Sequence, residues 1–399
     1  MAAWTRGLWL TGADEWIAWR AARRIRTVAH SDAGPGARWR GGSQTVFTSL
    51  KVSGYRGLKS LEVERLGRVN LVAGRNNSGK TSLLEAVFLL AHGGSAQGAI
   101  NSNVVRGGFG LRVTPDTNAR ARWVPLFHGL DTASQVSISG IHTDHGSLRL
   151  TIEHRYSTTF RTASSKRDTR LGAGGSPELH FSLSSAARKG RLSRHIRSRI
   201  SFGPKGTEVK GDGEPLVIPC VILSSGAHNP EDDAQRLGQL RVRKQADLVV
   251  EALRTVEPSL LGLDIIPGPE GQALWGDVGL PQQVPLTTLG DGLNRMARIV
   301  LAIGHDRVPL VLVDEIENGF HHSVLDAVWK VVYETAERFD AQVIATTHSY
   351  ECIRAAHDAS PGHDLALHRL DAEDDGMIRC VTYDSESIEG AMHHGFEVR

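Results

Sequence analysis

The sequence predicts an α/β fold in which a mostly parallel sheet is covered by helices. Three observations support this prediction. The apolar run Val69–Ala73 has the pattern of a buried strand, and a glycine-rich turn leads from it into the apolar helical run Ser82–Leu90. A second uniformly apolar segment, Leu310–Val313, is followed by a helical stretch at Ser323–Phe339. A third strand at Ala341–Thr346 continues the alternation of strand and helix that is typical of parallel sheets.

Length and composition are those of a globular protein with a large core. The 399 residues are enough for two structural lobes, 40% of them are hydrophobic, and the formal net charge is only +2. No apolar stretch approaches the roughly 20 residues that cross a bilayer, so we expect no membrane segment. Cys220, Cys352 and Cys380 lie too far apart for a disulfide framework or a metal-ligand spacing. We therefore expect a cytoplasmic protein.

The first 45 residues differ from the rest of the chain. They hold five of the eight tryptophans and seven arginines without sustained periodicity. One interpretation is a basic arm for nucleic acid or a membrane surface. The other, which we favour, is upstream sequence ahead of a true start at Val46, where regular patterning begins. We expect residues 1–45 to be a disordered or misannotated extension.

Residues 46–99 are predicted to form the first part of the core. Apolar and polar residues alternate over Val46–Val52 and Ser60–Glu64, as they do in paired half-buried strands, and Gly54–Gly57 connects the two. Residues 100–225 instead hold short β-like runs between clusters of Gly, Ser, Arg and Asp, which predicts an inserted, strand-rich lobe. The runs are Gln135–Ile141, Ser147–His154, Leu179–Leu183 and Leu216–Leu223.

The C-terminal half returns to the α/β pattern. Residues 226–285 are predicted to be a connector of helix and strand, which begins with a charged helical stretch over Pro230–Glu257. Residues 286–399 are predicted to form the second part of the core, in which helix Asp291–Gly304 precedes the apolar strand. The remaining expected elements are helix Ser349–Asp358 and two tail strands, Asp364–Leu370 and Met377–Tyr383.

The glycine-rich turn after Ala73 fits the phosphate-binding loop G-x-x-x-x-G-K-[ST] at every fixed position. Its glycines let several backbone N–H groups point at phosphate oxygens, and the positive end of the following helix adds attraction. Lys80 would reach the β- and γ-phosphates, and Thr81 would bind Mg²⁺. The alternative, a surface turn, does not account for the strand and helix on either side. The predicted nucleotide-binding residues are Gly74, Arg75, Asn76, Asn77, Ser78, Gly79, Lys80 and Thr81.

Three polar residues follow the ends of predicted core strands. Because α/β folds bind ligands at the carboxyl edge of the sheet, we expect Asp314 to orient Mg²⁺ through its water shell and Glu315 to polarise the water that attacks the γ-phosphate. His348, at the end of the next strand, is expected to contact the γ-phosphate. The alternatives are a helix-capping acidic pair and an ordinary surface or core histidine.

Two further segments point to phosphate groups supplied by another molecule. Gly290, Asp291 and Gly292 open the helix before the Asp-Glu strand, and backbone amides at a helix start can receive a phosphate from a second subunit. In isolation the same three residues are merely a turn. The arginine-rich stretch 188–210 has a single acidic residue and could neutralise nucleic-acid phosphates, or could be the solvent face of a strand and a loop. Both interpretations of this stretch stay open.

Together, these motifs resemble ATPases of the ABC and structural-maintenance-of-chromosomes (SMC) head class. Within it they are most similar to small bacterial AAA-family ATP-binding proteins related to RecF and to the ATPase domain of overcoming-lysogenization-defect nucleases. The resemblance covers Phe47–His92 and Leu286–Asp358, somewhat under a third of the chain. It implies a P-loop NTPase of ABC/SMC-head type with an inserted strand-rich lobe. It also implies a head-to-head homodimer or higher oligomer, with ATP and Mg²⁺ between the P-loop of one subunit and the signature motif of the other.

The resemblance also assigns residue roles. Lys80, Glu315 and His348 would be catalytic, with His348 as the switch, and Gly290–Gly292 would be the signature. Glu317–His322 occupies the place of the loop that crosses to the partner subunit. The chain departs from the class at Gly290, which stands where a serine normally bonds the partner's γ-phosphate, and no segment can be assigned as the glutamine loop.

The function implied is an ATP-hydrolysing subunit of a nucleic-acid-sensing or anti-phage defence complex. Relatives that carry a nuclease half have it after the ATPase segment, and only about 50 residues follow His348. We therefore expect a separate effector protein as partner, and nucleic acid as a possible one. Two alternatives stay open, an ATP-switched scaffold protein with incidental turnover and a DNA repair clamp like RecF.

Overall fold

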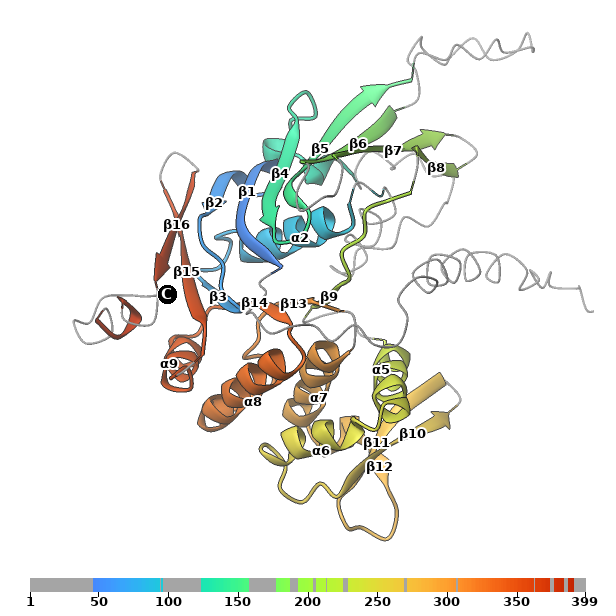
Figure 1. Ribbon diagram of the computed structural model, residues 1–399, viewed down its shortest axis with the longest axis vertical. Coiled ribbons are helices and arrows are strands. Elements are labelled where there is room, and N and C mark those ends of the chain that lie inside the picture. The colour runs from blue at the N-terminus through green and yellow to red at the C-terminus, as the bar shows by residue number, and fades with distance from the viewer. Residues whose placement is uncertain are drawn as a thin grey trace, which may run out of the picture. The chain divides into compact units, whose positions relative to one another are not determined.

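The structure is a computed structural model of the chain (Figure 1). Gln44–Arg399 forms one unit, and the described residues belong to it. The predicted extension over residues 1–45 lies outside them, as does much of residues 94–122 and 158–176. The described residues are 46–93, 95, 123–157, 177–186, 193–203, 206–212, 214–224, 229–268, 271–305, 308–361, 363–373, 377–383 and 387–390.

A six-stranded sheet runs through the centre of this unit in the order β16-β15-β3-β14-β13-β9 (Figure 1). All neighbouring strands are parallel except β15 and β16. Every residue of β3, β13 and β14 is buried, as expected of strands covered on both faces. The α/β class is therefore confirmed. The strands are β3 (Val69–Ala73), β9 (Cys220–Leu223), β13 (Leu310–Val313), β14 (Gln342–Thr347), β15 (Leu365–Ala372) and β16 (Ile378–Tyr383).

Five helices form a layer on one face of this sheet, below it in Figure 1. Helix α7 packs against α5, α6 and α8, and α8 packs against α9. One apolar core joins them to inward-facing strand residues such as Leu71, Val311 and Val343. None of the helices in the described parts is both long and apolar enough to cross a membrane. The five are α5 (Pro230–Val242), α6 (Ala246–Arg254), α7 (Asp291–Gly304), α8 (Leu325–Arg338) and α9 (Tyr350–Asp358).

Helix α2 (Lys80–Ala91) lies between the central sheet and a second, seven-stranded sheet. This second sheet is antiparallel and has the order β2-β1-β4-β5-β6-β7-β8. Helix α2 contacts β1, β4 and β5 of this sheet, and β9, β13 and β14 of the central sheet. All of its residues except Thr81 are buried, which explains why its sequence is apolar all round. The strands are β1 (Phe47–Tyr55), β2 (Leu58–Val63), β4 (Val136–His142), β5 (Gly146–Tyr156), β6 (Pro177–Ser185), β7 (Arg194–Gly203) and β8 (Gly206–Asp212).

Smaller elements complete the described chain. A three-stranded sheet packs beside α5, within the segment predicted as a connector. It consists of β10 (Gly262–Gly268), β11 (Gly271–Asp277) and β12 (Val284–Pro285). The 3₁₀ turns are Val124–Leu126, His128–Leu130, Leu286–Leu289 and His322–Val324.

One local prediction was wrong. Leu216–Leu223 was assigned to the inserted lobe, but only its end is a strand, β9, which pairs in parallel with β13. The helical stretch predicted over Pro230–Glu257 consists of two helices, because the chain turns at Lys244, whose φ is +61°. Strands β7 and β8 contain most of the arginine-rich stretch, in agreement with its interpretation as the face of a strand.

The seven-stranded sheet also crosses a predicted boundary. Strand β1 pairs with β4, so the sheet continues from residues 46–99 into residues 100–225. The hairpin of β1 and β2 is therefore the first part of the antiparallel layer, although its sequence lies next to the P-loop. The division into segments otherwise stays a prediction.

A buried amide ties the first strand to the central sheet. Gln342 Oε1 accepts hydrogen bonds from the backbone N–H groups of Val46 (3.1 Å) and Phe47 (2.9 Å). Its Nε2 donates to the carbonyl oxygens of Phe47 (2.8 Å) and Gly67 (2.9 Å). The side chain is fully buried at the start of β14, so all four bonds are shielded from water.

We expect Gln342→Leu to lower the free energy of unfolding by about 2–5 kcal/mol, because four buried backbone groups each lose a hydrogen bond, although the Gly67 carbonyl keeps a second side-chain donor, Asn70 Nδ2. Urea unfolding followed by circular dichroism measures the change. Gln272→Leu, on the exposed side of β11, is the matched control and should change the free energy by less than about 0.5 kcal/mol. Equal losses in the two variants would show that the buried network contributes nothing.

Candidate functional site

The P-loop, Gly74–Thr81, joins the carboxyl end of β3 to α2. Two of its glycines have positive φ, +151° at Gly74 and +88° at Gly79. A Cβ atom on Gly74 would lie 2.7 Å from the Leu370 carbonyl oxygen, and one on Gly79 would lie 2.5 Å from the Leu58 side chain. Both positions therefore require glycine, for backbone conformation and for close packing. The loop thus packs against β15 of the central sheet, through Gly74, and against β2 of the antiparallel sheet, through Gly79.

The side chains of the loop differ in exposure. Arg75, Asn76 and Asn77 are exposed, whereas Ser78 is buried. Ser78 Oγ is a buried hydroxyl oxygen with no hydrogen-bond partner among the described residues. A polar group that is shielded from water and unpaired is unfavourable unless a ligand completes it. This is the condition expected of a loop that takes up phosphate oxygens.

Lys80 lies beneath the loop at the start of α2. Its Nζ donates to the carbonyl oxygens of Gly74 (2.6 Å) and Arg75 (2.9 Å). Burial lowers the pKa of Lys80, although the nearby carboxylates, Asp314 first among them, act in the opposite direction. A phosphate would offer this ammonium a charged acceptor in place of the two neutral carbonyl groups.

The carboxylate after β13 meets the threonine of the P-loop. Thr81 Oγ1 donates to Asp314, with distances of 3.2 Å to Oδ1 and 3.1 Å to Oδ2. Thr346 Oγ1, at the end of β14, donates to Asp314 Oδ1 at 2.7 Å and holds this carboxylate in place. Hydroxyl and carboxylate oxygens are hard donors of the kind that Mg²⁺ binds, so the predicted metal residues Thr81 and Asp314 fit this ion.

Such a site would depend on more than side chains. In the described part of the chain, no three His, Cys, Asp or Glu residues come together as a metal-binding group. Mg²⁺ commonly keeps several water ligands and binds one or two carboxylates together with substrate phosphates. One hydroxyl and one carboxylate at the mouth of a P-loop match that pattern.

Glu315 has an unusual backbone conformation. Its φ is +49°, in the left-handed region that residues with a Cβ atom seldom adopt. Its backbone N–H donates to Thr346 Oγ1 (2.8 Å), and its Oε2 accepts from Asn318 Nδ2 (3.2 Å). The turn is thus fastened to the end of β14, and this sets the direction in which the Glu315 side chain leaves the backbone.

Arg295, on α7, donates hydrogen bonds to the backbone of the Asp314–Glu315 turn. Its Nη2 donates to the carbonyl oxygens of Asp314 (2.7 Å) and Glu315 (3.4 Å), and its Nη1 donates to that of Ser224 (3.3 Å). The residue is 6% exposed. Burial, and then the neighbouring Arg298, lower the pKa of Arg295 to about 10, so the side chain is still charged at neutral pH.

His348, the predicted switch residue, is held by a glutamate of the preceding loop. Glu317 Oε1 lies 3.2 Å from His348 Nδ1 and accepts from the His348 backbone N–H at 2.9 Å. It also accepts from Thr347 Oγ1 at 2.8 Å. Glu317 Oε2 is buried and unpaired within the described residues. The histidine side chain is half exposed, so its ring stays accessible while its position is fixed.

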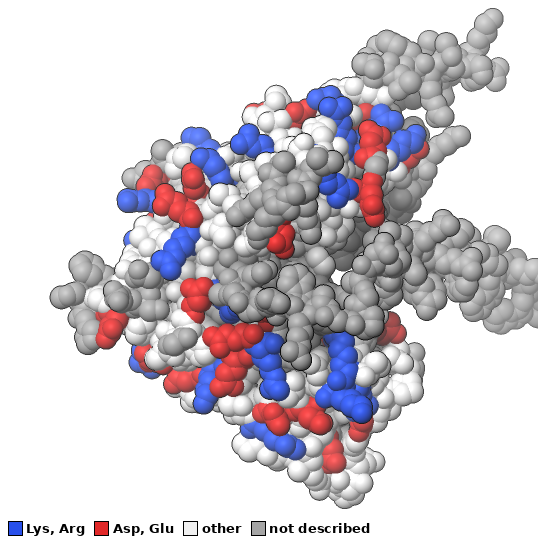
Figure 2. All heavy atoms as spheres, viewed as in Figure 1, with Lys and Arg blue, Asp and Glu red and all other residues white. Residues whose placement is uncertain are grey.

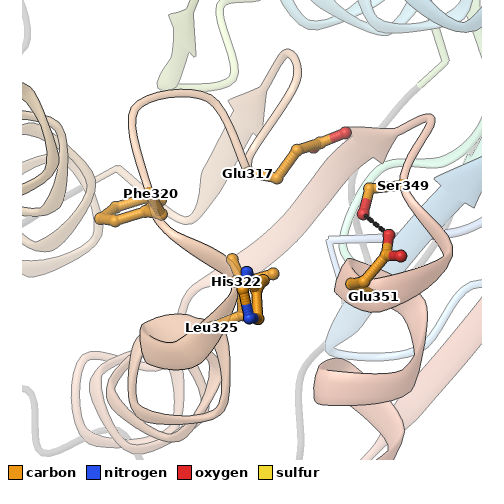
Figure 3. A pocket seen from close by; sticks show the side chains of 6 residues that line it. All are labelled: Glu317, Phe320, His322, Leu325, Ser349 and Glu351. Carbon is orange, nitrogen blue, oxygen red and sulfur yellow. Dashed lines mark hydrogen bonds between the residues drawn. The ribbon is translucent and has the colours of Figure 1, made fainter.

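A pocket of about 330 Å³ adjoins this Glu–His pair (Figure 3). Its wall combines carboxylates, a histidine and apolar side chains from the loop after β13 and the start of α9. Ser349 Oγ donates to Glu351 at 2.8 Å across one side of it. The pocket thus lies beside the predicted switch and outside the P-loop. It is lined by Glu317, Phe320, His322, Leu325, Ser349 and Glu351.

The predicted signature residues stand at the start of α7. Gly290 has φ +110° and ψ 150°, a combination open to glycine, and no side chain caps the helix. A Cβ atom on Gly292 would lie 3.0 Å from the carbonyl oxygen of Gly319, so this turn packs on the loop that follows β13. The first N–H groups of α7 lack a side-chain cap, as an anion-binding helix start requires.

Glu317, Thr346 and Arg295 were not identified from the sequence as site residues. Glu317 had only been placed in the loop assigned to the partner subunit, although it adds a third carboxylate within four positions of Asp314. The sequence signal for Thr346 was a hydroxyl side chain at the end of a predicted buried strand. The signal for Arg295 was a charge between Leu293 and Met296, in the apolar stripe of its helix.

Comparison with known proteins relates the chain to ATPases. Residues 227–354 match a family model described as "AAA domain, putative AbiEii toxin, Type IV TA system". A Helicobacter pylori protein named "ATP/GTP phosphatase" is 22% identical over 371 residues, which are 86% of this chain and 97% of that protein. The family match includes Asp314, Glu315 and His348 but not the P-loop.

Two other similarities are more limited. The DNA replication and repair protein RecF of Actinobacillus pleuropneumoniae is 43% identical over 59 residues, which are 15% of this chain and 16% of that protein. A solved SMC head, bound to the C-winged helix domain of ScpA, superposes with a TM-score of 0.46 at 13% identity. That alignment covers 88% of this chain and 100% of the SMC head.

The resemblance and the fold class predicted from the sequence are confirmed. The P-loop between β3 and α2, the parallel order β15-β3-β14-β13-β9, the family match and the relatives all agree with an α/β protein that resembles AAA-family ATPases. The β-like runs Gln135–Ile141, Ser147–His154 and Leu179–Leu183 correspond to strands β4, β5 and β6 of the antiparallel sheet, and their assignment to an inserted lobe stays a prediction.

Proposed function

We propose that this chain binds ATP on Gly74–Thr81 and hydrolyses it with the carboxylates that follow β13. The hydrogen bond between Thr81 and Asp314 is the observation that carries the proposal, because it joins two motifs 233 residues apart at one sheet edge. The H. pylori relative is named for the same chemistry, removal of phosphate from ATP or GTP. Either nucleotide is a candidate substrate, and we expect ATP to be preferred.

Each residue of the proposed site has a role that follows from its position. The P-loop N–H groups and Lys80 bind the phosphates, and Thr81 and Asp314 would hold Mg²⁺, which would neutralise charge on the phosphate oxygens. Glu315, fixed by its backbone bonds, accepts a hydrogen bond from the attacking water and orients it. His348, supported by Glu317, donates a hydrogen bond toward the γ-phosphate.

The proposal extends to a dimer. The start of α7 lacks a side-chain cap, so Gly290–Gly292 can receive the γ-phosphate of ATP bound to a second copy through backbone N–H groups. Gly290 itself offers no hydroxyl, so this contact would rest on the backbone alone. A separate effector protein and a role in defence rest on analogy with the family model, whose description names a toxin system.

Nucleic acid is the less supported partner. The basic residues of β7 and β8 are partly matched by acidic ones, as in Arg199–Glu178 (3.7 Å) and Lys210–Glu208 (2.8 Å). On the face seen in Figure 2, Lys and Arg are interspersed with Asp and Glu. Such a surface, in which acidic side chains offset the basic ones, favours weak contact with phosphates over tight binding.

Phosphate release by the purified chain tests the proposal. We expect turnover with ATP and Mg²⁺, and none after EDTA removes the metal. Adding DNA or RNA distinguishes a nucleic-acid-sensing ATPase, which should be stimulated, from a scaffold with incidental turnover. The proposal is wrong if ATP does not bind or if the bound nucleotide is never hydrolysed under any of these conditions.

The Glu317–His348 pair yields a separate prediction. Glu317→Ala and His348→Ala should each slow phosphate release about tenfold or more, and the double variant should be no slower, because Glu317 acts by positioning the ring that His348→Ala already removes. Steady-state kinetics of the three variants measure this. Glu337→Ala is the matched control, since Glu337 makes a similar pair with His363 (2.6 Å) at the end of α8. Fully additive losses would mean that Glu317 does not act through His348.

A further inference from the structure

Arg295 connects two parts of the proposed site through a single side chain. It lies in the second turn of α7, five residues after Gly290, and is almost fully buried. It donates to the carbonyl oxygen of Asp314 (2.7 Å), after β13, and to that of Ser224 (3.3 Å), after β9. The start of α7 is thereby linked to the ends of two strands of the central sheet.

Burying the charged Arg295 side chain costs more free energy than a purely structural contact at this place would. Within the described residues, the Arg295 guanidinium donates hydrogen bonds to backbone carbonyl oxygens, and its Nε is buried there without a partner. An apolar side chain of similar volume would fill this place without the penalty for burying a charge. Groups that are costly to bury and gather at one site point to function more often than to stability.

Arg298 provides an internal comparison. It stands one turn further along α7 and is also buried, at 9% exposure against 6% for Arg295. Its charge interacts with Asp233 on α5, which also pairs with Arg236 (2.8 Å). Its Nε is likewise buried with no partner among the described residues, so the two arginines differ mainly in their neighbours, the helical layer for Arg298 and the carboxylate turn for Arg295.

We propose that Arg295 is a positioning residue that couples phosphate binding at the start of α7 to the orientation of Glu315. The inference rests on the proposed function, in which Gly290–Gly292 receives a phosphate. A shift of α7 along its axis moves the guanidinium, and the guanidinium holds the carbonyl groups of Asp314 and Glu315. Because Glu315 already has a strained φ, a small movement there changes the direction of its carboxylate.

In a head-to-head dimer this coupling connects the two nucleotide sites. The phosphate at the start of α7 belongs to the ATP of the partner subunit, whereas the carboxylates moved by Arg295 act on the ATP of its own subunit. ATP bound at one site therefore prepares the other for hydrolysis. The expected signature is a cooperative dependence of turnover on ATP concentration.

Three variants of the full chain test the inference: Arg295→Met, Arg295→Lys and Arg298→Met. We expect Arg295→Met to bind ATP within about threefold of the wild type, to release phosphate about tenfold or more slowly, and to lose cooperativity. Arg295→Lys, which keeps one charged donor, should recover part of the rate. Arg298→Met should stay within about twofold of the wild-type rate, although it removes an equally buried charge from the same helix.

Hydrogen exchange provides a readout that does not need turnover. The amides of residues 314–318 should exchange faster in Arg295→Met than in Arg298→Met, because only the first variant frees the turn. If both variants exchange alike there, or lose rate only in proportion to their loss of stability, Arg295 is structural and the inference fails. If the wild type releases no phosphate, the proposed function fails, and the exchange comparison still decides the role of Arg295.

Discussion

Glu315→Gln is expected to slow ATP hydrolysis by about 10²–10⁴-fold while ATP binding stays nearly unchanged. The amide keeps the size of the side chain and can still accept from Asn318, but it is a far weaker acceptor for the attacking water. The turn itself should be preserved, since the backbone N–H of Glu315 bonds Thr346 in either variant. Single-turnover phosphate release and equilibrium binding of ATP, measured separately, give the two quantities.

Glu334→Gln is the matched control for this variant. Glu334 is an exposed glutamate of α8, so the same chemical change there should leave the hydrolysis rate within about twofold. If Glu315→Gln hydrolyses ATP at the control rate, another group orients the water. If it loses ATP binding instead, Glu315 contributes to the affinity and the catalytic assignment is wrong.

Lys80→Met is expected to weaken ATP binding by about 10- to 150-fold, the equivalent of one charged hydrogen bond of roughly 1.5–3 kcal/mol. The Met side chain fills the space of the lysine stem beneath the loop, so the fold should persist. Titration calorimetry measures the affinity, and thermal unfolding confirms that the variant is folded.

Lys330→Met serves as the control for lost charge. Lys330 is exposed on α8, and its replacement should leave the affinity within about twofold. Equal affinities for ATP in Lys80→Met and the wild type would place the nucleotide outside Gly74–Thr81. That result would remove the basis of the proposed function.

The central elements could be predicted because their patterns are local. Strand β13 and helix α7 have the predicted bounds, since an all-apolar strand and an amphipathic helix after a Gly-Asp-Gly turn are visible within a few residues. The P-loop was predictable for the same reason, because its fixed positions are contiguous. Its contact with Asp314 followed only from the rule that ligands bind at the carboxyl ends of parallel strands.

The failures concern contacts between distant segments. Strand β9 is short and looks like the strands of the antiparallel sheet, and only its pairing with β13 shows where it belongs. In β7, Ile196 and Ile200 face inward among arginines that are exposed or partly exposed, a weak alternation that the high charge of the segment obscured. The roles of Arg295 and Glu317 depend on which carbonyl and which histidine lie opposite them, and no local pattern records that.

A mixture of two inactive variants tests most directly whether each nucleotide site is shared between two subunits. Lys80→Met removes the P-loop lysine, and Asp291→Trp places a bulky side chain at the exposed start of α7. Each should be nearly inactive alone. In an equimolar mixture half of the dimers are mixed and each of these holds one intact site, which sets an upper limit of about a quarter of the wild-type phosphate release. The recovered rate should lie below this limit but clearly above that of either variant alone, because the intact site lacks the partner ATP that acts through Arg295. No recovery, or full activity of Asp291→Trp alone, would contradict a site shared between two subunits.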